Sequence, residues 1–180
     1  MPQTNLYTIT IAPMIKSLTA LKTVLDKATA HVEAHKLSWM SFEESMLNDR
    51  IIFDQFHLIR QIQIACDNAK GAAARLAEVE VPKHDDTEKT FAELQKRIDT
   101  TLEFVNSIKS EQIIGKEDIH VILPYFPDKY LTGFEYATEY AMPNFMFHVT
   151  TAYAIIRKNG VPLGKGDFIG SISFKDLKSV

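Results

Sequence analysis

One stretch near the C-terminus, PNFMFHVTTAYAIIRKNGVPLGKGD at residues 143–167, limits the fold of this chain more than any other part. Read at about 100° per residue, its first half forms an amphipathic helix. The buried face of that helix is made by residues that recur every three or four positions: Phe145, His148, Ala152 and Ile155. Gly160 ends the helix, because glycine readily adopts the left-handed conformation of a C-terminal cap. His148 is thus predicted to lie in a core, with Asn144 one turn before it.

Apolar spacing predicts two further helices in the first half of the chain. One spans about residues 6–35 and is either kinked at Pro13 or begins there. The next is a long helical region over about residues 42–76, with Ser41 and Glu44 forming a capping box at its start. The predicted buried face of this region is made by Ile52, Phe56, Ile59, Gln63 and Cys66.

A third apolar stripe predicts a helix that is capped by Asp86 or Thr87 and runs to about residue 109. The period then changes to the alternation typical of strands, and residues 118–134 are predicted to form a short hairpin or an extended excursion. Four helices with one long connection before the last favour an all-α fold, a four-helix bundle with a hairpin-like insertion before the last helix.

Composition limits the size and the partners of the protein. The 180 residues fit one domain, predicted at residues 1–170, followed by a polar tail at 171–180. A net charge of −3, from 20 basic and 23 acidic residues, lacks the basic face typical of nucleic-acid binding, so neither nucleic acid nor an anionic membrane is expected as a partner. The N-terminus has no basic segment of a signal peptide, and the chain is expected in the cytoplasm.

Three polar residues fall on the inward side of the second helical region. Arg60, Gln63 and Asp67 lie at i, i+3 and i+7, which places them on one stripe. Because buried polar groups without partners are costly, these side chains must either bond to one another or line a cavity. If they line a cavity, Arg60 is suited to hold an anion and Asp67 to act as a base or as a weak ligand.

Two segments together carry a resemblance to a known family. Residues 143–167 and the run RQIQIACDNAK at residues 60–70 resemble a branch of the DinB/YfiT-like superfamily, and the resemblance covers nearly the whole chain. It implies a four-helix bundle, often dimeric, related to metal-dependent enzymes that include thiol transferases and hydrolases.

The resemblance also implies a divalent metal, zinc or nickel, held by three histidines. One of them lies on the second helix and two form an H-x-x-x-H pair on the fourth. His148 matches the first histidine of the pair, but Ala152 stands where the second is expected. On the second helix His57 is available, at the edge of the inward stripe. A catalytic zinc site usually has three protein ligands plus water. Because Ala152 replaces one of the histidines, this chain lacks the full histidine triad.

Two functions from different classes follow. The first is a ligand-binding or structural homodimer, in which His148 is a core imidazole satisfied by Asn144, by a backbone carbonyl or by a polar group of the second helix. The alternative is a metal-dependent enzyme with an altered site, in which His148 faces Gln63 and Asp67 across the bundle. A further aromatic cluster is suited either to covering the mouth of the bundle or to forming a dimer surface: Tyr125, Phe126, Tyr130, Phe134, Tyr136 and Tyr140.

Overall fold

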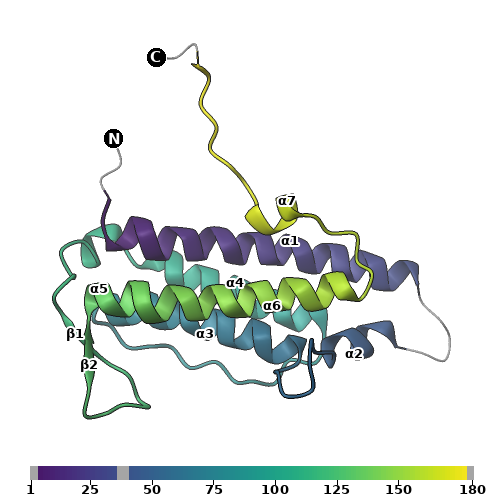
Figure 1. Cartoon of the computed structure of the whole chain (residues 1–180), viewed down its shortest axis with the longest axis horizontal. Coiled ribbons are helices and arrows are strands. Elements are labelled where there is room, and N and C mark those ends of the chain that lie inside the picture. The colour runs from purple at the N-terminus through teal and green to yellow at the C-terminus, as the bar shows by residue number, and fades with distance from the viewer. Residues whose placement is uncertain (1–3, 36–40, 178–180) are drawn as a thin grey trace.

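The computed structural model describes residues 4–35 and 41–177. Its long helices lie side by side along the longest axis in Figure 1. They are α1 (Ala12–Ala34), α3 (Leu58–Leu76), α4 (Phe91–Ser107) and α6 (Met142–Lys158). The apolar faces of all four helices contribute to one hydrophobic core. The predicted all-α fold, a four-helix bundle with a short hairpin before the last helix, is confirmed.

The first helix begins before Pro13. A π-helical turn, η1 (Tyr7–Ile11), runs directly into α1, and Pro13 occupies the first turn of α1, where its missing N–H is tolerated. Within the described part of the chain, the helical stretch Tyr7–Ala34 is long and apolar enough to cross a membrane by length and composition. The core helix of a bundle passes the same test, and Leu18 and Leu25 are fully buried against the other helices.

The long helical region predicted over residues 42–76 is interrupted. The chain forms a short helix, α2 (Phe42–Leu47), then a loop over residues 48–57, and only then α3. The prediction that Ile52 and Phe56 lie on a buried face is therefore wrong, because both belong to the loop and more than half of each is exposed. At the start of α2 the side-chain oxygen of Ser41 accepts a hydrogen bond from the Glu44 N–H, as predicted.

Asp49 fixes this loop to the fourth helix. Its backbone carbonyl accepts a hydrogen bond from the Leu58 N–H, which closes the loop at the start of α3. Its carboxylate accepts hydrogen bonds from Lys158 at 3.0 Å and from Asn159 at 2.7 Å. These bonds join residues more than 100 positions apart in the chain.

The third long helix, α4, starts later than predicted. Thr90 is its cap and forms a capping box with Glu93, so the predicted caps Asp86 and Thr87 lie outside the helix. After a turn at Glu78, residues 79–89 cross between α3 and α4 without regular structure. The predicted apolar stripe of the helix is confirmed by its buried residues, among them Leu94, Ile98 and Val105.

A 3₁₀ turn, η2 (Ser110–Gln112), leads from α4 to the predicted hairpin. Strands β1 (His120–Ile122) and β2 (Tyr130–Thr132) pair antiparallel, with Val121 opposite Leu131. Figure 1 shows the hairpin at one end of the bundle. Gly133 follows β2 closely, and a side chain there would place its Cβ 2.0 Å from the Lys116 carbonyl oxygen, so only glycine fits.

The last long helix is extended at its N-terminal end. A short helix, α5 (Gly133–Glu135), and a π-helical turn, η3 (Tyr136–Ala141), run without a break into α6. At the other end Gly160 has a φ of +89°, which confirms the predicted glycine stop.

The chain then returns over the first helix. The glycine-rich turn after α6 leads to α7 (Lys165–Ile169), which packs against α1. Asp167 on α7 accepts a hydrogen bond from Lys27 on α1 at 2.6 Å. Residues 170–176 have no helix or strand, and residues 178–180 of the predicted tail lie outside the described residues.

Candidate functional site

His148 lies in the interior, between α6 and α3. Only 7% of its surface is exposed, as the apolar periodicity of α6 predicts. Its Nδ1 is 2.7 Å from Oε1 of Gln61, which is 1% exposed. The α3 residue that faces His148 is therefore Gln61, and the prediction that His148 faces Gln63 and Asp67 is wrong.

The hydrogen bonds of Gln61 determine which ring nitrogen of His148 carries a proton. The Gln61 amide nitrogen donates to the backbone carbonyl of Phe56 at 2.9 Å, so the amide oxygen must point to the imidazole. An amide oxygen only accepts, and Nδ1 of His148 is therefore the donor. Burial lowers the pKa of His148, and the positive charge of Arg60 lowers it further, so the ring is neutral at physiological pH with its proton on Nδ1.

A second polar pair lies along the same helix contact. The side-chain nitrogen of Asn144 donates to the side-chain oxygen of Asn68 at 3.1 Å, again joining α6 to α3. Asn144 thus bonds to α3 and does not satisfy His148. Both polar pairs join α3 and α6, whose apolar faces are otherwise in close contact.

His57 has a structural position at the start of α3. It is the cap residue of the helix, and its Nδ1 accepts a long hydrogen bond of 3.5 Å from the Arg60 backbone N–H. Burial lowers the pKa of His57, and the nearby Arg50 and Arg60 side chains add to that effect. A ring nitrogen that caps a helix N-terminus is directed at backbone N–H groups, and its lone pair is engaged there.

The residues Arg60, Gln63 and Asp67 belong to a different polar cluster, on the side of α3 that faces α4 and the connection before it. Gln63 is about 200° around the helix from Gln61, which explains why the two glutamines point in opposite directions. Gln63 accepts a hydrogen bond from Arg60 at 3.2 Å and donates to Glu88 at 2.8 Å. Arg60 also pairs with Asp86. The three residues predicted to share one stripe do lie in one network.

The centre of this network is Arg97, which the sequence analysis did not identify. Its side chain is 2% exposed, and its guanidinium contacts three carboxylates at 2.9 to 3.0 Å: those of Asp67, Asp86 and Glu88. It also donates to the backbone carbonyl of Asp85 at 3.1 Å. The helical spacing could have identified Arg97, because this residue lies within about 60° of Leu94 on the buried face of α4. A charged residue on such a face needs partners, and these come from α3 and from the segment that precedes α4.

Cys66 lies next to this network but remains a core residue. It is fully buried, and burial raises the pKa of its thiol to about 12. The nucleophilic form of cysteine is the thiolate, so Cys66 is inert at neutral pH.

The donor atoms of the site do not fit the implied metal. His148 offers one free nitrogen, Nε2, because its Nδ1 is bonded to Gln61. Ala152, one turn further along α6, is buried and has no donor atom. Residues 4–35 and 41–177 contain no group of three histidine, cysteine, aspartate or glutamate side chains placed to hold an ion. A single imidazole nitrogen is not a zinc or nickel site, for which three protein ligands are usual.

Comparisons with known proteins agree with this fold. A family model described as a domain of unknown function (DUF1993) matches residues 6–169. Among solved structures, the crystal structure of a DinB family member protein from Shewanella denitrificans matches with a TM-score of 0.87 and 43% sequence identity, over 95% of each chain. No curated protein matches the chain. The resemblance to a DinB-like branch is therefore confirmed.

Proposed function

The chain belongs to the DinB-like family described as a domain of unknown function (DUF1993), and from this premise we propose that it acts by binding, as a homodimer that needs no metal. The observation that carries the proposal is the bond between His148 Nδ1 and Gln61 Oε1 at 2.7 Å. At the position where the resemblance implies a metal ligand, the imidazole joins two core helices. The protein is then a bundle whose interior serves stability, and its function belongs to its surface.

The polar residues first considered as a ligand site support the same proposal. Each of them is bonded within the protein: His148 to Gln61, Asn144 to Asn68, and Arg60, Gln63 and Asp67 within the Arg97 network. A ligand that used these groups would have to replace bonds that are already made. The proposal retains a small-molecule ligand and the cytoplasm as the location, and it involves neither nucleic acid nor a membrane.

The support for a dimer comes from the loop at residues 48–57, which we call the apolar loop and which projects from the bundle near α2 in Figure 1. It exposes large apolar side chains, with Phe53 exposed by 83%: Ile51, Ile52, Phe53 and Phe56. Clusters of this kind on a soluble protein mark surfaces that bind another protein. Because Asp49 fixes the loop to α6, the cluster is held in place before association, which lowers the entropy lost on binding.

The experiment is sedimentation equilibrium on the full chain, with and without EDTA. We expect two chains per particle in both conditions, and we expect Phe53→Glu to shift the particle to one chain, because it places a charge in the centre of the apolar loop. Phe174→Glu is the matched control, since Phe174 is exposed to the same degree in the tail and should leave the dimer intact. A wild-type monomer, or a dimer that dissociates on chelation, would contradict the proposal.

A further inference from the structure

A hollow of about 290 Å³ lies where the hairpin meets η3, and we call it the hairpin pocket. Its wall comes from both strands, from the turn that joins them and from one helical residue: Val121, Leu123, Phe126, Lys129, Tyr130, Leu131 and Tyr140. Val121 and Leu131 face each other across the antiparallel pair, so their side chains leave the hairpin on the same face. The hollow is thus bounded by apolar groups from three parts of the chain.

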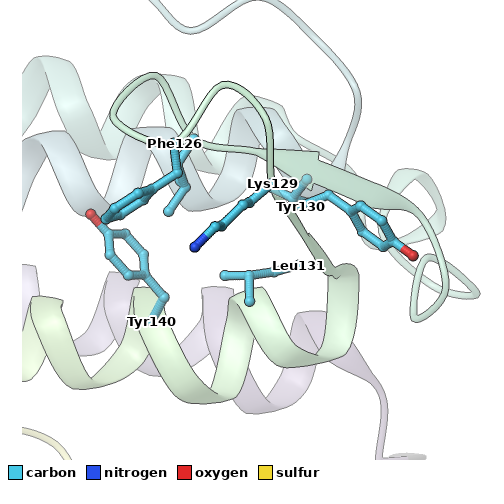
Figure 2. Close-up of a pocket in the computed structure, with 7 residues that line it drawn as sticks. Phe126, Lys129, Tyr130, Leu131 and Tyr140 are labelled. Carbon is cyan, nitrogen blue, oxygen red and sulfur yellow. The ribbon is translucent and has the colours of Figure 1, made fainter.

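Figure 2 shows how the side chains divide between the two faces of the hairpin. The rings of Phe126 and Tyr140 lie close together on one side of the hollow, with Leu131 on the other. The ring of Tyr130 points away, and it stacks on His120 with ring centroids 3.8 Å apart. The aromatic cluster seen in the sequence therefore has separate roles, since Tyr136 is buried in the core and Tyr125 is exposed.

Among the residues that the structure describes, Lys129 is the only charged one that lines the pocket. In Figure 2 its ammonium group extends into the hollow, between Tyr140 and Leu131. Within the described residues it makes no salt bridge and no hydrogen bond through its side chain. The neighbouring Asp128 is exposed and does not line the pocket. A cation without a partner at the edge of an apolar hollow favours an anion that also has an apolar part.

We propose that the hairpin pocket binds a small organic carboxylate with an apolar chain or ring. The carboxylate pairs with the ammonium of Lys129, and the apolar part lies against Val121, Leu131 and the ring of Tyr140. The volume is at the lower limit of ligand pockets, which is about 300 Å³, so ligands of about ten non-hydrogen atoms fit best. This site is separate from His148 and from the apolar loop, so it adds a ligand class to the proposed function without depending on the dimer.

The test is a calorimetric and NMR titration of the full chain with octanoate, 1-octanol and octylamine. Octanoate should bind saturably at one site per chain and shift the resonances of Val121, Leu131 and Tyr140. Because Lys129 is exposed, Lys129→Met should weaken octanoate binding only about fivefold, as for a surface charge pair, and change octanol binding by less than about twofold. Lys175→Met removes an exposed lysine of the tail and should change neither.

Three results would overturn the proposal. One is the absence of saturable octanoate binding to the folded wild-type protein. The second is an octanoate affinity that Lys129→Met leaves unchanged, and the third is octylamine binding as tightly as octanoate. Sedimentation of the same samples shows whether the protein is a dimer. If a dimeric protein does not bind octanoate, the proposed ligand site is refuted and the proposed dimer is not.

Discussion

Replacing Arg97 with methionine is expected to lower the free energy of unfolding by about 3 kcal/mol, because a buried charged group is removed from partners that remain. The Arg97 side chain is 2% exposed and joins Asp67, Asp86 and Glu88. Methionine fills much of the space but leaves Glu88 without its salt bridge to Arg97. Asp67 keeps its pair with Lys70, and Asp86 keeps its pair with Arg60. The value is at the lower end of what such changes cost, because Asp67 and Asp86 are partly exposed to water.

The measurement is urea unfolding followed by circular dichroism. Arg60→Met is the matched control, since Arg60 pairs with the same Asp86 but has a side chain that is 36% exposed. The loss for that variant should be below about 1 kcal/mol, as for other surface pairs. Equal losses for the two variants would show that Arg97 does not organise the network.

The His148–Gln61 pair should show strong energetic coupling. His148→Leu leaves the buried amide oxygen of Gln61 without a donor, and a loss of about 2 kcal/mol is expected. Gln61→Leu should cost a similar amount, because it leaves Nδ1 of His148 and the Phe56 carbonyl without partners. The double variant has no imidazole or amide left to satisfy, so its loss should be smaller than the sum by about 1 kcal/mol or more.

Two controls define this result. The Asn144–Asn68 pair is only partly buried, so the same cycle with alanine at both positions should give a smaller coupling.

The second control is the pH dependence of the free energy of unfolding. Because the pKa of folded His148 is lowered from 6.5, the unfolded chain binds the proton more readily. This contribution to stability is present above pH 6.5 and is lost as the pH falls through the folded pKa, and His148→Leu should remove it. If the free-energy losses of His148→Leu and Gln61→Leu were additive in the double variant, the two side chains would not be a structural pair.

Most of the helices follow from the sequence, because each has to bury one face. The buried residues of α1, α4 and α6 recur at helical spacing, and local signals such as Gly160 set one boundary correctly. The apolar loop could not be predicted in this way. Its residues Ile52 and Phe56 continue the helical spacing of α3, and no glycine or proline interrupts residues 48–57. Contacts of Asp49 with Asn159 and Lys158, distant in the chain, hold the loop open.

The burial of His148 could be predicted from the sequence, but the partners of the site residues could not. The spacing around His148 correctly placed the imidazole in the core, and the departure at Ala152 pointed to an incomplete metal site. The choice between Gln61 and Gln63 depends on which face of α3 is turned towards α6. The sequence analysis assigned the inward face partly from Ile52 and Phe56, which lie outside the helix. Arg97 was missed because two of its carboxylate partners, Asp86 and Glu88, lie in the segment before its helix, which has no periodicity.

We expect His148 to hold the core together without a metal, and the metal content of the purified protein measures this directly. Elemental mass spectrometry is applied to untagged protein purified without chelator, beside a His148→Ala variant. We expect far less than one transition-metal ion per chain in both proteins. A content near one zinc or nickel per chain that disappears in the variant would contradict the claim and would support a metal-dependent enzyme.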